Sequence, residues 1–495
     1  MKKCFLRLVS FLCAACLLGS VAVSAVDYDT TAAYIVETVA SPKNASIGGE
    51  WSVIGIARGE YSGSSKTAFN ENYLAAANQA VKEKGGKMSS AKSTEYSRMI
   101  LALSSLGKNA KNTAGYDLYS GLSDMSFVTK QGLNGSIFAL IALDAKNTAP
   151  RGNVTRQALI RKIIAAQNSD GGFSLSAAAD SDVDVTAMAL QALAPYKCIP
   201  KVSSSIESAL SFLSKKQNSD GSYTSYGNKN CESACQVVIA LCTLDISPNT
   251  DSRFVKNGKS VYASVLSFGL SDGSFKHVAD KGANLMATEQ ALCAMAAYKR
   301  LSENKSALYD MSGYICPFTD ISSSAKRDSI KLLAKLGVVN GTTKTTFSPS
   351  ANVTRAEFCT MLAKMLVLPA AKDAGFSDVK KGDWYYGYVN SAFASGVVNG
   401  KGSGKFCPND KITREEAAVM LERASKKYAA EYRSHGTGAL TAFSDASQIS
   451  SWAKNSVAYC VSEKMYVSES GRLSPSKALT REELAAMFCG FWLGV

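Results

Sequence analysis

The chain has 495 residues, more than one hydrophobic core usually organises, so we expect two or three domains. Its 19% charged residues and near-zero mean hydropathy are typical of a globular protein and exclude an extensively membrane-embedded one. The formal net charge of +14 favours an acidic partner. No run of Lys and Arg is interleaved with aromatic residues, which argues against nucleic acid as that partner.

The first 25 residues have the pattern of a secretory signal peptide. A basic start and an apolar run at 8–18 precede the small residues Val23-Ser24-Ala25. The apolar run is too short to cross a bilayer core of ~30 Å comfortably, and no later stretch reaches the ~18 apolar residues that a span needs. We therefore predict cleavage after Ala25, export, and no membrane span in the mature protein.

A repeated turn divides residues 26–305 into units. The turn reads QNSDGGF at 167–173, QNSDGSY at 217–223 and GLSDGSF at 269–275. Its glycine recurs at 171, 221 and 273, every 50 to 52 residues. The glycine permits a turn with positive φ, and the aromatic residue can fill the space between neighbouring helix pairs.

Ala-rich apolar segments lie between these turns. Their apolar residues are spaced by three and four, which is typical of helices, and almost no stretch alternates as a strand would. We expect two helices in each period. The expected helical segments are 95–106, 135–143, 158–166, 185–194, 206–213, 235–244 and 286–297.

The Gln-x-x-x-Gly-x-aromatic turn, alternating with Ala-rich helices, resembles that of the α/α-toroid superfamily. This superfamily includes squalene and other terpene cyclases, protein prenyltransferases and cobalamin carriers. The match is clear at the first two turns, has Gly269 in place of Gln at the third, and fades upstream. The resemblance implies an all-α toroid over residues 26–305, and because a shared fold does not confer a shared function, its role stays open.

The segment 182–187 reads DVDVTA and resembles the Asp-x-Asp-Asp-Thr-Ala acid motif of the cyclases. The resemblance makes Asp184 the catalytic acid if the toroid is an enzyme. Val185 replaces the last Asp, one toroid is half of a two-domain cyclase, and His277 alone cannot complete a prenyltransferase zinc site. Alternatively, Asp182 or Asp184 caps the following helix. We favour a binding or spacer role over a cyclase-like or prenyltransferase-like enzyme.

Acidic residues recur near the expected starts of the inner toroid helices. Glu95, Asp184, Glu232 and Glu289 occupy these places, and Asp182 lies beside them. The positive end of a helix dipole stabilises carboxylates there. We expect these side chains to collect around one mouth of the toroid, where they would favour a polar or cationic small-molecule ligand over a bare polyprenyl chain.

Ten cysteines follow residue 25, mostly as single residues in apolar surroundings, and small buried hydrophobes are their leading interpretation. Cys231 and Cys235 lie one helical turn apart, which suits either two metal ligands or one buried helix face. A closed metal site needs four ligands, and the chain has only His277 and His435 as histidines. We predict no metal site and no cofactor.

A polar stretch at 306–313 is expected to link the toroid to a second family of repeats. Its three units cover residues 314–371, 372–436 and 437–495. Each unit has an aspartate in its opening Phe-(Thr/Ser)-Asp sequence; these are Asp320, Asp378 and Asp445. Each aspartate is followed 35 or 36 residues later by an arginine; these are Arg355, Arg414 and Arg481.

Each of these arginines lies in a Thr-Arg-x-Glu sequence whose Thr and Glu are typical of a capping box. A cation at the first helical position opposes the helix dipole, at a cost of a few tenths to ~1 kcal/mol. We therefore expect each arginine to face a bound anion that also uses the free amides of the helix start. Alternatively, each pairs with the aspartate of its own repeat. On the first hypothesis, replacing all three by Ala removes binding without unfolding the domain.

The second unit resembles the S-layer homology module throughout. It reads FSDV at 376–379, then Trp384, GVVNG at 396–400, FCP at 406–408 and TREE at 413–416. The first unit keeps GVVNG and Phe-Ser-Pro but has no Trp near residue 325. The third keeps Trp452 and Leu-Ser-Pro but has KMYV at 464–467 in place of the glycine-rich stretch.

This resemblance implies a pseudo-threefold helical spindle whose grooves bind a secondary cell-wall polysaccharide, typically one with ketal-linked pyruvate. A Trp ring would stack on a sugar face. The implied contact residues are Asp320, Arg355, Asp378, Trp384, Arg414, Asp445, Trp452 and Arg481. The departures in the first and third units make the grooves of Arg414 and Asp378 the most competent. We expect a secreted protein held on the cell wall or S-layer of a Gram-positive-type bacterium.

Overall fold

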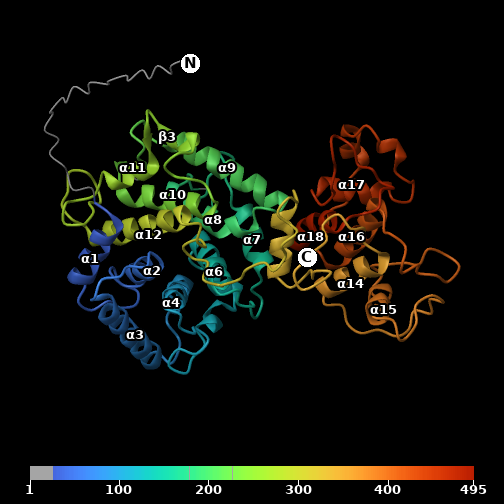
Figure 1. The fold of residues 1–495 in the computed structure, drawn as a ribbon, viewed down its shortest axis with the longest axis horizontal. Helices are drawn as coiled ribbons and strands as arrows, with labels where there is room; N and C mark the ends of the chain where they lie inside the picture. Colours follow the sequence, from blue (N-terminus) through green and yellow to red (C-terminus); the bar gives the residue numbers. More distant parts are fainter. Residues whose placement is uncertain (1–25, 178, 226) are drawn as a thin grey trace, which may run out of the picture.

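The computed structural model describes residues 26–177, 179–225 and 227–495, so the predicted signal peptide lies outside the described residues. Two bodies lie side by side, one coloured blue to yellow and one orange to red (Figure 1). The described chain is mainly helical, which confirms the all-α prediction. Its two small antiparallel hairpins pair β1 (Thr224–Ser225) with β2 (Asn228–Lys229) and β3 (Val255–Lys256) with β4 (Lys259–Ser260). Within the described ranges, no helix has the length and apolarity to cross a membrane.

The first body is an α/α toroid. Its inner helices form a closed ring in which each packs on the next and the last on the first: α2 (Glu50–Arg58), α4 (Ser93–Ser105), α6 (Leu133–Ala145), α8 (Val183–Leu193), α10 (Cys231–Thr243) and α12 (Leu285–Ser302). The outer helices are α1 (Tyr28–Thr38), α3 (Lys66–Glu83), α5 (Met125–Thr129), α7 (Arg156–Ala165), α9 (Pro200–Lys216) and α11 (Val261–Leu266). Short 3₁₀ turns are η1 (Leu118–Leu122), η2 (Ala194–Tyr196) and η3 (Ser252–Phe254).

The repeated turn joins outer helices to inner ones. Its three glycines have φ of +89°, +84° and +89° at Gly171, Gly221 and Gly273. A Cβ on Gly171 would lie 2.5 Å from the carbonyl oxygen of Ser208 in α9, so the turn also needs glycine for close approach. Gln167 Nε2 donates to the carbonyl oxygens of Gly171 and Ser205, both at 2.8 Å. Gln167 therefore ties the first turn to the next outer helix. In the second turn, Gln217 Nε2 donates to the carbonyl oxygens of Gly221 and of Phe254 in η3, both at 3.0 Å, and the third turn has Gly269 in place of the glutamine.

In the second body, the three repeats are joined by packing between their helices. Its helices are α13 (Arg327–Lys335), α14 (Arg355–Met365), α15 (Tyr386–Ala394), α16 (Arg414–Tyr428), α17 (Lys454–Ser462) and α18 (Arg481–Gly494), with 3₁₀ turns η4 (Thr437–Ala442) and η5 (Ala446–Gln448). The second helix of each repeat packs on the first helix of the next: α14 on α15, α16 on α17, and α18 back on α13. At the centre, Val353 N–H donates to Leu479 O, Leu479 N–H to Ile412 O and Ile412 N–H to Val353 O. The three repeats thus close a ring.

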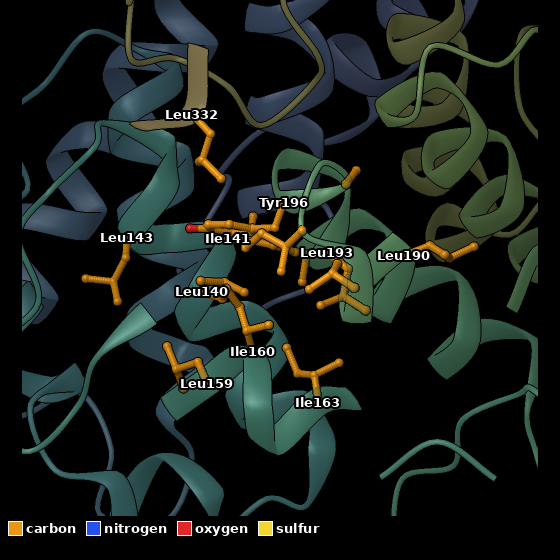
Figure 2. Close-up of a cluster of buried hydrophobic side chains, with 14 of the residues drawn as sticks. Leu140, Ile141, Leu143, Leu159, Ile160, Ile163, Leu190, Leu193, Tyr196 and Leu332 are labelled. Carbon is orange, nitrogen blue, oxygen red and sulfur yellow. The ribbon is translucent and has the colours of Figure 1, made fainter. Parts of the chain in front are cut away.

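The C-terminal helix joins the two bodies. α18 packs on α7 of the toroid, and the rings of Tyr196 and Trp492 stack with centroids 5.9 Å apart. Arg161 Nη1 donates to Leu493 O at 2.7 Å. Figure 2 shows Leu332 of α13 close to Tyr196 and the leucines and isoleucines of the toroid. A hydrophobic core therefore continues from one body into the other.

Candidate functional site

The aspartate of each repeat holds the loop that contains the Phe-x-Pro sequence. Asp378 accepts hydrogen bonds from the backbone N–H groups of Phe406 and Cys407, each at 2.8 Å. Asp320 and Asp445 accept the two corresponding bonds in their own repeats. Burial raises the pKa of Asp378, but the two amides outweigh it and hold that pKa below its usual value.

The three arginines at the helix starts point into the fold. Their exposed fractions are 4% for Arg355, 0% for Arg414 and 7% for Arg481. Arg355 donates from Nε to Phe406 O at 3.0 Å and from Nη2 to Asn399 O at 2.9 Å. Arg481 donates in the same way to two carbonyl oxygens of the first repeat. Each guanidinium therefore donates to carbonyl oxygens near the Phe-x-Pro loop of the next repeat. The backbone N–H groups of that same loop donate to the aspartate of the next repeat.

Arg414 also carries a buried ion pair. Its Nη1 donates to Leu473 O at 3.0 Å, and its Nη2 lies 2.5 Å from Glu483 Oε1. Glu469 lies 3.2 Å away on the surface side. Burial alone would lower the pKa of Arg414, but the contact with Glu483 outweighs burial and raises it. Arg414 thus links the second repeat to the third.

The expectation that these helix starts keep free amides for an anion is contradicted. Arg355 N–H donates to Asp410 O and Ala356 N–H to Pro408 O, and Thr354 and Glu357 complete a capping box. The same backbone hydrogen bonds and capping boxes are found at the corresponding helix starts of the other two repeats. The alternative pairing of each arginine with its own repeat's aspartate is not made, since those carboxylates accept from amides. Direct contact between the arginines and an anion stays a prediction.

Two tryptophans are exposed on the second body. Trp384 is 61% exposed and Trp452 is 59% exposed. They lie two residues before α15 and α17, the helices that pack on α14 and α16 of the preceding repeats. An indole presents a flat apolar face with one polar edge, which suits contact with a sugar ring. An exposed indole thus precedes two of the three helices that pack on a neighbouring repeat.

The toroid covers the third groove, between α18 and α13. Ala325 precedes α13, where the other repeats have Trp, and lines a cavity of about 330 Å³. Pro200 and Cys198 of the toroid line the same cavity. The repeat that lacks Trp therefore turns that position toward the toroid.

The unusual loop of the third repeat also contacts the toroid. Lys464 has φ of +57° at the place where the first two repeats have a glycine with positive φ. Left-handed backbone is unfavourable for a lysine, but Lys464 Nζ donates to Ser204 Oγ of α9 at 2.9 Å. The adjacent Glu463 forms an ion pair with Lys201 of α9, with Lys201 Nζ 2.5 Å from Glu463 Oε2. Both departures from the repeat pattern thus lie at one interface.

Asp182 caps α8, which confirms one of the two capping alternatives. Its Oδ1 accepts from the N–H groups of Asp184 at 2.9 Å and Val185 at 3.0 Å. Burial and, to a smaller extent, the negative charges of Asp182 and Glu232 together raise the pKa of Asp184 to about 6. Glu232 contacts His277 Nδ1 at 2.8 Å. The structure therefore brings Asp182, Asp184 and Glu232 together.

A second acidic group lies on α12 and α2. Glu289 is 2% exposed, and its Oε2 accepts from Gly48 N–H at 2.8 Å and Ser52 Oγ at 3.1 Å. Burial raises the pKa of Glu289 to about 7. Burial also raises the pKa of Glu50, and Glu95 adds to that shift. Sequence reasoning missed Glu50, although it directly precedes an apolar run and so marks a helix start.

The cysteines of the described chain are all free. Cys231 and Cys235 lie on one buried face of α10, with their Sγ atoms 3.7 Å apart. No group of three or more His, Cys, Asp or Glu in the described ranges could hold a metal ion. Among the described residues, no further side chain joins these two thiols to form a set of metal ligands.

The S-layer homology domain family matches residues 317–359, 375–418 and 442–485. The second body consists of three S-layer homology repeats. The prenyltransferase α/α toroid domain family matches residues 122–312 of the first body. S-layer homology domains generally bind cell-wall polysaccharide, and the repeats localise this chain to the cell wall or S-layer of a Gram-positive bacterium.

Known proteins share parts of the chain. It is 39% identical over 175 residues to "Exoglucanase XynX" of Acetivibrio thermocellus, covering 35% of this chain and 16% of that protein. It is 36% identical to "S-layer protein sap" of Bacillus anthracis, covering 32% and 19%. The chain thus spans less than a fifth of the length of these relatives. An unsaturated glucuronyl hydrolase from Bacillus sp. GL1 aligns with TM-score 0.41 and 9% identity over 58% of this chain and 98% of that one.

Proposed function

We propose that the S-layer homology repeats hold this protein on the cell wall by binding an anionic secondary cell-wall polysaccharide, one that bears ketal-linked pyruvate. The observation that carries the proposal is the pair of exposed indoles, Trp384 and Trp452, at 61% and 59% exposure. Each lies two residues before a helix that packs on a neighbouring repeat, where a sugar chain could follow the groove. Stacking of a sugar face on the indole would bury apolar surface of both partners.

Exposed lysines near the indoles supply positive charge that the buried arginines do not present. Lys380 and Lys381 lie just before Trp384, and Lys454 lies just after Trp452, and all three are exposed. A carboxylate on the polymer would pair with these ammonium groups. The net charge of +11, which remains once the predicted signal peptide with Lys2, Lys3 and Arg7 is removed, would attract the polymer from a distance. The arginines then act by fixing the loops that shape each groove.

The third groove serves a different purpose in this proposal. The toroid covers the edge between α18 and α13, and the lysine of the altered loop donates to the toroid. We infer that two grooves bind polymer and that the third positions the toroid. This assignment explains why the repeat pattern is incomplete at Ala325 and at Lys464, and nowhere in the second repeat.

Wall binding of the full chain should weaken about tenfold in Trp384→Ala and in Trp452→Ala, equivalent to ~1.4 kcal/mol each. The double variant should lose binding, and all three should keep their stability because the indoles are exposed. Co-sedimentation with isolated cell walls measures this. Tyr116→Ala, a 39% exposed aromatic residue of the toroid, is the matched control. Undiminished sedimentation of the double variant would rule the proposal out.

For the toroid, we propose a displayed module that binds a small polar or cationic ligand among Asp182, Asp184, Glu232, Glu289 and Glu95. Neighbouring carboxylates on adjacent inner helices would attract a cation or accept hydrogen bonds from a polar ligand. The second candidate is a cyclase-like enzyme. The burial of Asp184 favours it, because burial and the nearby carboxylates raise the pKa of this group to about 6 and a general acid needs a pKa near the working pH.

Incubation of the full chain with squalene, short prenyl diphosphates and cobalamin separates the two candidates. We expect no turnover, because Asp184 lies beside Asp182 and Glu232 rather than alone in an apolar cavity. A ligand retained without turnover would fit a binding module. Cyclised product that disappears in Asp184→Asn would instead establish the enzyme.

A further inference from the structure

One pair of cysteines lies across the boundary between the two bodies. The Sγ atoms of Cys198 and Cys489 are 3.9 Å apart. Cys198 lies in the short turn between η2 and α9 of the toroid and is partly exposed. Cys489 lies on α18 of the third S-layer homology repeat and is 0% exposed. The two thiols therefore meet although they are 291 residues apart in the chain.

The surroundings hold these two sulfur atoms together. Tyr196, two residues before Cys198, stacks on Trp492, three residues after Cys489, with an interplanar angle of 8°. Arg161 donates to the carbonyl oxygen of Leu493 at the end of the same helix. These contacts fix both backbones around the pair, so the thiols stay close without a covalent bond.

We propose that Cys198 and Cys489 form a disulfide that clamps the toroid to the third S-layer homology repeat. A disulfide bond is ~2.0 Å long, so the two Sγ atoms have to approach by about 2 Å for the bond to form. The cell wall lies outside the reducing cytosol, where disulfides form and persist. The bond would hold the toroid over the third groove in the wall-anchored protein.

The geometry also sets the order of the reaction. Cys198 lines the 330 Å³ cavity and a second interface cavity of about 610 Å³, so an oxidant can reach it. Its thiolate attacks the disulfide of an oxidant, either a low-molecular-weight disulfide or a thiol oxidoreductase, and releases one thiol. Cys489 then gives up its proton and attacks the sulfur of Cys198, which releases the second thiol. The two cysteines lose two electrons and two protons, and the oxidant disulfide becomes two thiols.

Burial makes Cys489 the resolving thiol in this scheme. Burial raises the pKa of Cys489 well above its usual value, and the nearby Cys198 sulfur raises it further. A thiol with a raised pKa is a poor first nucleophile, so attack on the oxidant falls to the partly exposed Cys198. Cys231 and Cys235 are as close to each other but are both 0% exposed on one helix, and we expect them to stay reduced.

Oxidation of the purified, reduced full chain tests the clamp. The chain is incubated with oxidised glutathione, alkylated with iodoacetamide, digested without reduction and mapped by mass spectrometry. We expect loss of two free thiols and one cross-linked peptide pair that contains residues 198 and 489. Cys198→Ser should abolish the cross-link, whereas Cys235→Ser, the matched control, should keep it.

Three outcomes would overturn the proposal. The first is a full complement of free thiols after oxidation. The second is a glutathione adduct on Cys198 with no cross-link to Cys489. The third is a cross-link from Cys198 to a different cysteine, such as Cys316, which lines the larger interface cavity. Because Cys198 is partly exposed, Cys198→Ser should fold, and its thermal unfolding checks this directly.

Discussion

Replacing Arg414 by alanine is expected to lower the free energy of unfolding of the repeat body by about 3 kcal/mol, because it breaks the buried ion pair with Glu483. Only the partly exposed Lys477, 3.2 Å from Glu483 Oε1, would then pair with that carboxylate. Arg414 is 0% exposed and also donates to Leu473 O, so its loss removes a link between the second and third repeats. Urea unfolding followed by Trp fluorescence measures the change, since Trp384, Trp452 and Trp492 all lie in the repeat body.

Arg433→Ala is the matched control, because Arg433 has an 80% exposed side chain in the same body. Its effect should stay within about 0.5 kcal/mol, as for most surface substitutions. The result also decides between two roles for the arginine. If Arg414→Ala left stability unchanged and removed wall binding, the side chain would contact the polymer, as the sequence alone suggested, and the structural role would be excluded.

Stability of the toroid should fall as pH rises from 5 to 8, and Glu289 should be a main cause. Burial raises its pKa from 4.5 to about 7, so the folded state holds a proton that the unfolded state has already released. Stability is full below the unfolded pKa and is lost as pH rises through the folded one. The loss attributable to Glu289 is at most about 3 kcal/mol.

Glu289→Gln keeps the size of the side chain and removes its titration. Thermal unfolding of the variant should therefore show a flatter dependence on pH than the parent between 5 and 8. Glu50 has a pKa raised by burial as well and should leave a residual slope in the same direction. Glu37→Gln, at an exposed position of α1, is the control. Equal slopes for the parent and Glu289→Gln would show that the carboxyl is solvated.

The helices of the toroid could be predicted where local physics defines them. The turns at 167–173 and 217–223 require positive φ at one glycine, and that requirement made the repeat visible in the sequence. The helix after each turn begins with a polar cap such as Asp182 or Asn230. Upstream, α1 to α3 lack this turn, so no period is visible in that part of the sequence. α1 and α2 are positioned by packing against α12, and α3 by packing against α2, and no local pattern encodes these contacts.

The role of the arginines could not be predicted from local sequence. The Thr-Arg-x-Glu pattern correctly marks a helix start, but the dipole argument assumed that the arginine faces solvent. Arg355 instead bonds to Phe406, 51 residues away, and Arg481 to Phe347, 134 residues away. Only the closed ring of repeats brings those carbonyl oxygens to the guanidinium groups. The cost of placing a cation at the helix start is offset by contacts that are remote in sequence.

The missing Trp and the altered loop were visible in the sequence, but their cause was not. Both suggested a weakened groove. The structure places both against residues 198–204 of the toroid, more than 250 positions away from Lys464. A departure from a repeat pattern can therefore mark an interface between domains as well as the loss of a site.

The number of polymer fragments bound per chain tests most directly whether two grooves bind the wall polymer. Isothermal titration of the full chain with a short pyruvylated wall oligosaccharide should give about two sites per chain, with about one left in Trp384→Ala or Trp452→Ala and none in the double variant. The two grooves with exposed indoles predict this result. Three sites in the parent, or an unchanged number in the tryptophan variants, would contradict it.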